Sequence, residues 1–455
     1  MSARRNIAVL DIGKTNAKVV MVDGLTGRET ASRNTANRVI RIAPYPHYDV
    51  DMLWDFIADA LSEFVKAPGI DAISVTAHGA AAALIGEDAL AMPVIDYEFV
   101  YPDDVRAAYD EIRPPFNETC SPLLPGGLNV GAQIHYQKTQ FPEAFAGVRK
   151  IVTYAQYWVW RLSGIAVNEV TSLGCHTDLW NPREKVYSSL VDRLEIRDLM
   201  APIRSAFDEI GNLRPAIAAR IGVDRPIPVY CGIHDSNASL LPHLTTRVSP
   251  FSVVSTGTWA VSFAVGGRLD QLNAARDTLA NVDCYGNPVP SARFMGGREF
   301  DLLTGDGKND PDAETVRQVI GARRMVLPAI VKGSGPFPQR EAEWPNGEPQ
   351  SAQERNAAAS LYTALMTHTC LELIGACGPT IVEGPFARNS IYLSALRSLT
   401  GRDVVALPGS TGTSLGAAIL AGATSTLASS SIAVEPLADS FQAYAMSWQA
   451  SLKNE

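Results

Sequence analysis

The chain has 455 residues, a natural length for two domains, with 46% hydrophobic and 19% charged residues and a formal net charge of -9. The acidic balance, without a Lys/Arg run, argues against a nucleic-acid partner, and no stretch approaches the ~20 apolar residues of a membrane span. The chain enters a strand too early for a signal peptide and its six cysteines form no CxxC pair, so we expect a cytoplasmic protein with buried, reduced thiols.

The first predicted element is a hairpin at residues 6–23, NIAVLDIGKTNAKVVMVD, in which a sharp turn joins two apolar strands. Gly13 in this turn permits a positive φ and leaves the backbone open to a ligand. Thr15 and Asn16 beside it supply hydroxyl, amide and N–H donors. A turn of this composition can cradle phosphate.

Three further segments of the first half carry clear signals. Residues 49–67 have apolar side chains at helical spacing after an acidic start. Residues 72–85 read as a buried strand interrupted by His78, and residues 148–164 as a strand end followed by a helix. Residues 227–244 predict a strand that feeds a turn and then a short helix.

The second half begins with a repeat of the first hairpin, at residues 250–265, PFSVVSTGTWAVSFAV. Gly257 occupies the turn between Thr256 and Thr258. Two such turns, about half a chain apart, predict two similar lobes that grip one phosphorylated ligand from both sides.

The rest of the second half contains a long insert and an alternating pattern. We expect residues 266–350 to be irregular and residues 356–378 to form a helix that ends at glycine. Strand and helix patterns alternate from 379 to 423, which predicts a parallel sheet covered by helices. The tail, 425–441, is low in complexity and is expected to be peripheral apart from a last helix.

Two aspartates lie where a carboxylate could do chemistry. Asp11 ends the first strand, just before the phosphate turn. A carboxylate beside a phosphate site needs its charge neutralised, and Mg²⁺ would do this. From this position alone, a strand-end cap or turn residue is the stronger interpretation of Asp11. Asp235 follows an apolar strand in GIHDSNAS, where it could take the proton of an attacking hydroxyl. On this window alone, a helix N-cap is slightly favoured.

His78 either hydrogen-bonds a polar ligand or is a core histidine, the second being favoured in isolation. The sequence has no metal-ligand spacing, no GxSxG, no Walker-A motif and no GxGxxG after a strand. The sequence therefore disfavours three classes of enzyme: P-loop kinases, serine hydrolases and Rossmann dehydrogenases.

Six segments resemble, in order and spacing, the FGGY family of carbohydrate kinases: DIGKTNAK, TAHGAAAAL, GIHDSNAS, STGTW, VEGPFARN and GTSLGAAILAG. The likeness covers nearly the whole chain, and the turn in DIGKTNAK resembles the branch that phosphorylates L-fuculose, L-rhamnulose and related ketoses. It implies a two-lobed α/β fold of the actin, hexokinase and Hsp70 type, a duplicated ribonuclease H-like core with an interlobe active-site cleft. Residues 1–245 would be the sugar and first-phosphate domain, and 246–455 the second-phosphate and adenosine domain.

The resemblance also assigns roles to residues. Asp235 would be the general base, and Asp11 a catalytic residue that lies near Mg²⁺ and the phosphates. The implied sugar-binding set is His78, Gly79, Asp96, Glu98, His234 and Asp235, where the acid of the family's sugar motif is either Asp96 or Glu98. The implied nucleotide-binding set is Gly13, Lys14, Thr15, Asn16, Lys18, Ser255, Thr256, Gly257, Thr258, Gly384, Asn389 and Gly412.

The chain departs from the family pattern in two places. The adenosine motif reads EGPFARN, so Pro385 and Phe386 replace small residues and would reshape the purine pocket or lower nucleotide affinity. Lys14 stands where Thr, Ser or Ala is usual; this extra cation would help to hold phosphates or would simply be solvated.

We thus expect ATP- and Mg²⁺-dependent phosphorylation of a sugar hydroxyl, with the sugar and ATP as partners and a homodimer as one candidate assembly. Two alternatives stay open: an acetate- or polyphosphate-type enzyme of the same superfamily fold, which the HG motif disfavours, and a non-catalytic ATP-dependent binding module. Asp235 disfavours the second, and the altered adenosine motif keeps it open.

Overall fold

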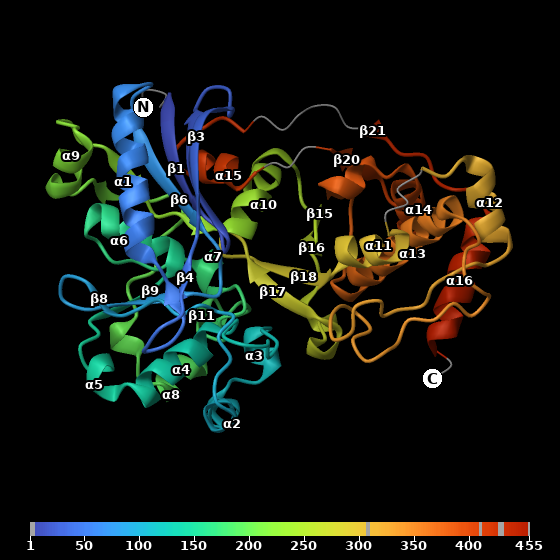
Figure 1. Ribbon diagram of the computed structural model, residues 1–455, viewed down its shortest axis with the longest axis horizontal. Helices are drawn as coiled ribbons and strands as arrows, with labels where there is room; N and C mark the ends of the chain where they lie inside the picture. The colour runs from blue at the N-terminus through green and yellow to red at the C-terminus, as the bar shows by residue number, and fades with distance from the viewer. Residues whose placement is uncertain (1–4, 306–309, 409–411, 426–431, 454–455) are drawn as a thin grey trace. The chain divides into compact units, whose positions relative to one another are not determined.

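The computed structural model describes residues 5–305, 310–408, 412–425 and 432–453, and the chain divides into two compact units (Figure 1). Unit 1 comprises Met1–Thr246, Ala280–Pro288 and Thr411–Leu427. Unit 2 comprises Arg247–Leu279, Val289–Ser410 and Ala428–Glu455.

The central sheet of unit 1 has the strand order β12-β13-β6-β1-β2-β3, and β14 also pairs with β6. Strand β1 is antiparallel to β2 and parallel to β6, so the first hairpin feeds the centre of the sheet. All of β6 is buried, as expected for a central strand covered on both faces. The strands are β1 (Asn6–Ile12), β2 (Asn16–Asp23), β3 (Glu29–Ala36), β6 (Ala72–Ala77), β12 (Glu209–Asn212), β13 (Pro228–Tyr230) and β14 (Ile233–His234).

Helices and small sheets surround this sheet. The described helices of unit 1 are α1 (Val50–Lys66), α2 (Asp103–Ile112), α3 (Phe116–Thr119), α4 (Val130–Gln140), α5 (Pro142–Phe145), α6 (Tyr154–Ser163), α7 (Val170–Leu173), α8 (Ser189–Arg193), η1 (Arg197–Leu199), α9 (Pro215–Ile221), α10 (Asp235–Thr246) and α15 (Thr413–Leu420). The small sheets are formed by β4 (Val39–Ile40) with β5 (His47–Tyr48), by β8 (Leu90–Met92), β7 (Ala82–Ile85) and β9 (Lys150–Thr153), and by β10 (Trp180–Asn181) with β11 (Val186–Tyr187).

The second seven-stranded sheet, which belongs to unit 2 except for most of β17, repeats the arrangement around the hairpin. Its order is β17-β18-β16-β15-β19-β20-β21. Strand β15 is antiparallel to β16 and parallel to β19, as β1 is to β2 and β6. The predicted two-domain α/β fold is confirmed. The strands are β15 (Phe251–Thr256), β16 (Ala260–Val265), β17 (Thr278–Val282), β18 (Pro288–Phe294), β19 (Thr380–Glu383), β20 (Val404–Leu407) and β21 (Ile432–Ala433).

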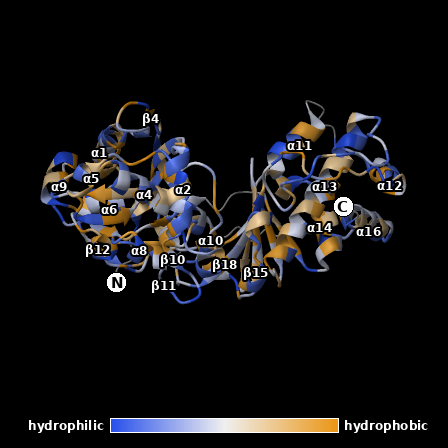
Figure 2. Ribbon diagram, turned by 90° about the horizontal axis from the view of Figure 1, so that it is seen from below, coloured by the Kyte–Doolittle hydropathy of each residue, from blue (hydrophilic) through white to orange (hydrophobic). Residues whose placement is uncertain are grey.

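Hydrophobic residues, orange in Figure 2, run along the helices of unit 2. The long helix α13 crosses the core of this unit, and every one of its residues from Asn356 to Thr367 is buried. The described helices of unit 2 are η2 (Leu269–Gln271), η3 (Ala274–Arg276), α11 (Gly296–Thr304), α12 (Ala313–Gly321), α13 (Ala352–Leu373), η4 (Pro385–Arg388), α14 (Ser390–Thr400) and α16 (Ser440–Lys453).

Two expectations about the second half were wrong in detail. The stretch 266–350 is not irregular throughout, because β17, β18, α11 and α12 lie within it. Helix α13 starts at Ala352 and not at 356, because the Ser351 hydroxyl caps it by accepting a hydrogen bond from the Glu354 amide at 3.1 Å. It ends at Leu373, well before Gly378. The predicted last helix exists as α16, and it packs into the core of unit 2, where Trp448 is only 1% exposed. Residues 426–431 of the tail lie outside the described residues.

Candidate active site

Asp11 lies at the end of β1 and is held by the first turn of α15, 402 residues away in sequence. Its Oδ2 atom accepts hydrogen bonds from the Thr413 hydroxyl and, at 3.4 Å, from the Ser414 hydroxyl. Burial raises the pKa of Asp11, and the carboxylate of Asp235 raises it further, while Thr413 and Lys18 oppose the shift. The site thus brings both predicted catalytic aspartates into electrostatic contact within unit 1.

The hairpin turn after Asp11 is closed by backbone bonds. The Gly13 amide donates to the Asn16 carbonyl at 2.9 Å, and the Gly257 amide donates to Trp259 in the same way in unit 2. Neither glycine adopts a positive φ, so that expectation was wrong. Only the second turn has open space: a Cβ on Gly257 would lie 3.9 Å from the Trp259 carbonyl oxygen, whereas a Cβ on Gly13 would lie 3.0 Å from the Asn16 carbonyl oxygen.

The polar residues after Gly13 divide into two groups. Thr15, Asn16 and Lys18 are exposed, with the Asn16 amide donating to the Thr15 hydroxyl at 3.1 Å. Lys14 instead turns inward and is 17% exposed. Its ammonium forms an ion pair with Asp96 and lies 3.6 Å from a carboxylate oxygen of Glu98, beside residues that were predicted to bind the sugar.

His78 lies in the connection between β6 and β7, inside an aromatic cluster. Its ring centroid lies 5.1 Å from that of Tyr48, 5.5 Å from that of Tyr97 and 4.8 Å from that of Tyr154. Nδ1 donates to the Gly79 carbonyl at 2.7 Å, whereas Nε2 is buried without a partner among the described residues. Burial lowers the pKa of His78 to about 4, so the ring is neutral and Nε2 is an acceptor near pH 7.

Asp235 begins α10 directly after β14 and is half-buried. Its Oδ1 atom accepts a hydrogen bond from His234 Nε2 at 2.9 Å and from the Ser236 amide at 2.6 Å. Burial raises the pKa of Asp235, but His234 outweighs burial and the net shift is downward. His234 is itself only 4% exposed, so it contacts the base rather than a solvent-filled space.

Sequence reasoning missed a buried cluster behind His234. The Cys175 sulfur lies 3.7 Å from His234 Nε2, and the His234 amide donates to the Thr171 hydroxyl at 3.0 Å. Thr171 in turn is bound by the carboxylate of Glu169, which is fully buried. Burial raises the pKa of Cys175, but His176 and His234 outweigh it and bring it to about 5. No local motif marks these residues, because they come together only in the fold.

Unit 2 contains a cavity of about 550 Å³ beside the second hairpin turn. Of the predicted nucleotide-binding residues, Gly257, Thr258 and Asn389 line it, whereas Ser255, Thr256 and Gly384 are not among its lining residues. Pro385, Phe386 and Arg388 of the predicted adenosine motif also line it. The other lining residues, which sequence reasoning did not assign to the nucleotide site, are Gly297, Phe300, Asp301, Asp310, Pro311, Asn356, Ser390 and Ile391.

The altered adenosine motif forms the edge of this cavity. Gly384 adopts φ of 80°, and a Cβ there would overlap the Thr256 carbonyl oxygen. The Thr256 hydroxyl donates to the Glu383 carbonyl and accepts from the Phe386 amide at 3.2 Å. Phe386 is 6% exposed and packs into the core of unit 2, so much of its bulk is taken up by the core.

Asn389 and Gly412 occupy helix starts. The Asn389 side chain accepts from the Tyr392 amide at 3.0 Å and donates to the Ser360 hydroxyl at 2.9 Å, which makes it the N-cap of α14. Gly412 precedes α15 with φ of 69°. It therefore belongs to unit 1, next to the helix turn that holds Asp11, whereas Asn389 belongs to unit 2.

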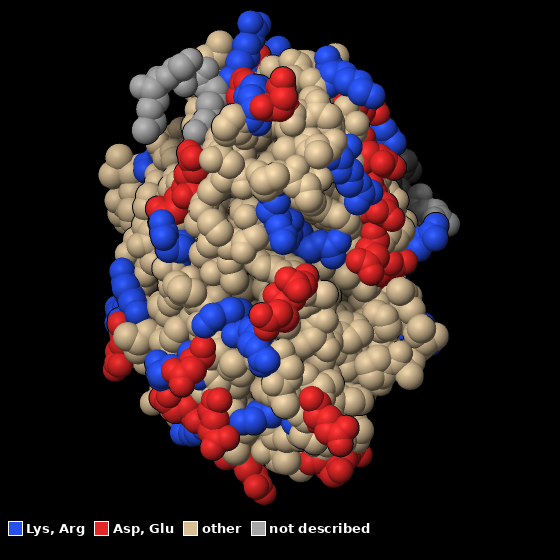
Figure 3. Space-filling model, turned by 90° about the vertical axis from the view of Figure 1, so that its left-hand side faces the viewer, with Lys and Arg blue, Asp and Glu red and all other residues tan. Residues whose placement is uncertain are grey.

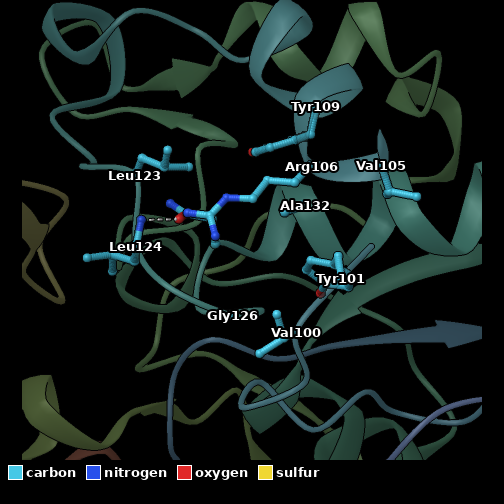
Figure 4. A pocket seen from close by; sticks show the side chains of 10 residues that line it. Val100, Tyr101, Val105, Arg106, Tyr109, Leu123, Leu124, Gly126 and Ala132 are labelled. Carbon is cyan, nitrogen blue, oxygen red and sulfur yellow. Dashed lines mark hydrogen bonds between the residues drawn. The ribbon is translucent and has the colours of Figure 1, made fainter. Parts of the chain in front are cut away.

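A separate hollow in unit 1 lies beside the start of α2, where Val100, Tyr101 and Val105 line it (Figure 4). It is lined mainly by apolar side chains, with Arg106 lying between Leu123 and Leu124 on one side and Tyr101 on the other. On the molecular face in Figure 3, acidic and basic side chains are interspersed. In the described part of the chain, no cluster of three His, Cys, Asp or Glu residues suits a metal ion, and no helix is long and apolar enough for a membrane span.

Comparisons with known proteins bear on the family and the fold. A family model described as the FGGY family of carbohydrate kinases, N-terminal domain, matches residues 116–242, and one described as carbohydrate kinase FGGY, C-terminal domain, matches residues 248–429. The chain is 37% identical to a carbohydrate kinase from Novosphingobium aromaticivorans, with a TM-score of 0.91 and 99% of both chains covered. No curated protein matches the chain.

More distant solved structures share the fold alone. A xylulose kinase from Lactobacillus acidophilus is 16% identical, with a TM-score of 0.76 over 98% of this chain and 96% of that one. A Plasmodium falciparum glycerol kinase with ADP is 13% identical, with a TM-score of 0.78 over 99% of this chain and 98% of that one.

Proposed function

This chain belongs to the FGGY family of carbohydrate kinases, and we propose that this ATP-dependent sugar kinase acts on a ketose such as L-fuculose or L-rhamnulose, with Asp235 as the general base. The observation that carries the proposal is the position of Asp235. It starts α10 in unit 1, and its charge acts on His78, Tyr97 and Asp11, so the base, the proposed sugar residues and the first phosphate turn are neighbours.

The proposed step is an in-line transfer of the γ-phosphoryl group to a sugar hydroxyl. Asp235 accepts the hydroxyl proton as the oxygen attacks phosphorus, and the leaving oxygen stays on ADP. The hydrogen bond from His234 fixes one Asp235 oxygen, which leaves the other for the substrate. Since His234 lowers the pKa of Asp235, the base is ionised at neutral pH and ready to receive the proton.

The amide groups of the two hairpin turns support binding of the phosphates, one turn in each unit. The donor set around Asp11 fits Mg²⁺ carried in with ATP, because Mg²⁺ typically takes one or two carboxylates plus phosphates and water. Asp11 would hold the ion, with Thr413 and Ser414 orienting the carboxylate. Magnesium bound there would neutralise charge on the phosphates.

The domain roles are part of the proposal. Residues 1–245 would bind the sugar and the first phosphate, and residues 246–455 the second phosphate and the adenosine, for which the cavity beside Gly257 offers room. Closure of the two domains on both ligands would exclude water, which otherwise competes with the sugar as acceptor.

The test is a coupled ADP-release assay across ketoses, aldoses and polyols, with Mg²⁺ and with EDTA. We expect sugar-dependent ADP release with a ketose, which the Asp235→Asn variant loses. Release that is fastest with a polyol or an aldose would overturn the ketose assignment. Release that persists in the Asp235→Asn variant would remove Asp235 from the mechanism.

A further inference from the structure

The Lys14 side chain connects the first phosphate turn with the proposed sugar site. Its ammonium forms an ion pair with Asp96, which lies 82 residues away and is 1% exposed. The same nitrogen lies 5.1 Å from the ring centroid of Tyr48 and 4.6 Å from that of Tyr97. Such cation–π contacts stabilise a partly desolvated ammonium. Lys14 is therefore neither solvated nor turned toward the exposed Thr15 and Asn16 side chains.

The groups around Lys14 have unused hydrogen-bonding capacity. Asp96 Oδ1 accepts from Lys14 and from the Glu98 amide at 3.2 Å, while Asp96 Oδ2 is buried without a partner among the described residues. His78 Nε2 and the Tyr48 hydroxyl are unpartnered in the same sense. Buried polar atoms are normally paired, so these atoms mark the place of a polar ligand.

These free groups also indicate what kind of ligand fits. Asp96 Oδ2 can only accept hydrogen bonds, and neutral His78 accepts at Nε2 because Nδ1 donates to Gly79. A ligand at these two atoms must therefore donate, which sugar hydroxyls do and a carboxylate does not, while the Tyr48 hydroxyl can donate or accept. The charge of Lys14 is already balanced by Asp96, and Glu98 adds a further negative charge.

From these contacts we infer that Lys14 is a specificity-determining residue of the sugar site, which holds Asp96 in place and selects neutral polyhydroxyl sugars over sugar acids. The inference rests on the proposed function and deepens it. The ammonium has three donors, of which one binds Asp96, so another can donate to a sugar oxygen while Asp96 accepts from a neighbouring hydroxyl. Lys14 thus acts on the sugar and not on the nucleotide, although it lies in the phosphate turn.

The first test is the Lys14→Met variant, which keeps the aliphatic stem and removes the charge. With L-fuculose, L-rhamnulose and D-xylulose as probes, we expect the sugar KM to rise by about 10- to 100-fold, the cost of a lost charged hydrogen bond. Titration with a non-hydrolysable ATP analogue should give the wild-type Kd. The matched control is Lys66→Met, at an exposed position in the last turn of α1.

Because Lys14→Met leaves a buried carboxylate unpaired, it can destabilise the fold. The Lys14→Met/Asp96→Asn double variant removes both charges, and it should recover the melting temperature without recovering the sugar KM. Asp96→Asn alone frees the ammonium of Lys14. We expect it to raise the ratio of kcat/KM for D-gluconate to that for the neutral sugars, whereas Lys14→Met should not.

The outcomes separate this inference from the proposed function. A Lys14→Met variant with an unchanged sugar KM, or with a weakened ATP analogue instead, overturns the inference alone. A wild-type protein that prefers D-gluconate also overturns it. If the wild-type protein phosphorylates a neutral polyol but no ketose, the ketose assignment is overturned. The KM of the Lys14→Met variant is then measured with that polyol, and it tests the inference in the same way. Binding of no neutral sugar overturns both.

Discussion

At the scale of single residues, the carboxylate of Asp235 is held ionised by a neighbour that is itself out of solvent. His234 is nearly fully buried, and its ring bonds to Asp235 on one side and faces Asn237 at 3.2 Å on the other. This arrangement makes His234 a positioning residue for the proposed base. It also means that Asp235 has one oxygen committed and one available.

The first prediction concerns this base. The Asp235→Asn variant keeps the side-chain volume but cannot accept the proton, so kcat should fall by about 10²- to 10⁴-fold while sugar affinity changes much less. Steady-state kinetics of ADP release measure both quantities. The control is Asp59→Asn, on the exposed face of α1. A variant that keeps most of its turnover would exclude Asp235 as the base.

The second prediction concerns His78. The His78→Phe variant keeps a ring against Tyr48 and Tyr154 but removes the acceptor Nε2. Because the imidazole is neutral, with a pKa of about 4, sugar binding should weaken by about 0.5–1.5 kcal/mol, the value of an uncharged hydrogen bond. Calorimetry with the sugar and with the ATP analogue checks this. A lower melting temperature with unchanged sugar affinity would favour a core histidine instead.

The third prediction concerns Glu169, where burial raises the pKa to about 7. In the unfolded chain the carboxyl ionises near its ordinary pKa, while the folded protein retains the proton until the pH reaches about 7. The unfolded state therefore binds fewer protons in this window, and this group's contribution to stability falls as the pH rises through it. The Glu169→Gln variant lacks that contribution.

The measurement for Glu169 is the difference in unfolding free energy between the Glu169→Gln variant and the wild type at several pH values. We expect the difference to shift in favour of the variant as the pH rises from about 4.5 to about 7. Other groups titrate equally in both proteins and cancel. A difference that is flat with pH would show that Glu169 is already ionised in the folded protein.

At the scale of elements, the second hairpin turn leaves open space beside Gly257, as the proposed phosphate site requires. Glycine is needed at 257 for access and not for a left-handed backbone, since its φ is not positive and no protein atom fills the space beside it. The neighbouring Gly297 is different, because a Cβ there would overlap the Gly257 carbonyl oxygen. The second turn is therefore tightly packed on the side that faces Gly297 and open on the side where a Cβ of residue 257 would lie.

The fourth prediction follows from that open side. The Gly257→Ala variant adds a methyl group that meets no protein atom closer than 3.9 Å, so the fold should be unaffected while the KM for ATP rises. Gly321→Ala is the matched control, since it also has open space and no positive φ and lies outside the cavity lining. If ATP kinetics and circular dichroism both match the wild type, the second turn is not a phosphate cradle.

At the scale of the whole molecule, the proposed sugar site lies in unit 1 and the cavity proposed for the nucleotide lies in unit 2. A reaction between the two ligands requires a state in which both are bound and adjacent. A ligand favours such a state only by binding it more tightly than the other states.

The fifth prediction is reciprocal coupling between the ligands. The sugar substrate should tighten binding of a non-hydrolysable ATP analogue, and the analogue should tighten sugar binding by the same factor. Calorimetric titrations with and without the second ligand measure the factor, and small-angle scattering reports compaction. Equal affinities in all titrations, with no compaction, would contradict domain closure even for an active kinase.

The chain sequence by itself determined the two hairpins and the elements with the clearest patterns, among them α1, β6 and the alternating strands and helices from 379 to 423, whereas α2 to α5, α11 and α12 were not predicted. These features depend on contiguous residues: alternating or continuous apolar runs, glycines in turns and capping residues. Asp11, His78 and Asp235 could therefore be singled out, because each interrupts or ends an apolar segment. The sequence also pointed to the family, since six short segments keep their order.

The tertiary structure alone decided which of these residues meet. Lys14 pairs with Asp96 across 82 residues, Thr413 reaches Asp11 across 402, and Cys175 lies beside His234 across 59. Such pairs depend on strand order and on which helix covers which sheet, and no local pattern encodes them. The physical reason is that a side chain's conformation follows from its own segment, whereas its partner and its pKa follow from the burial and charges that other segments bring.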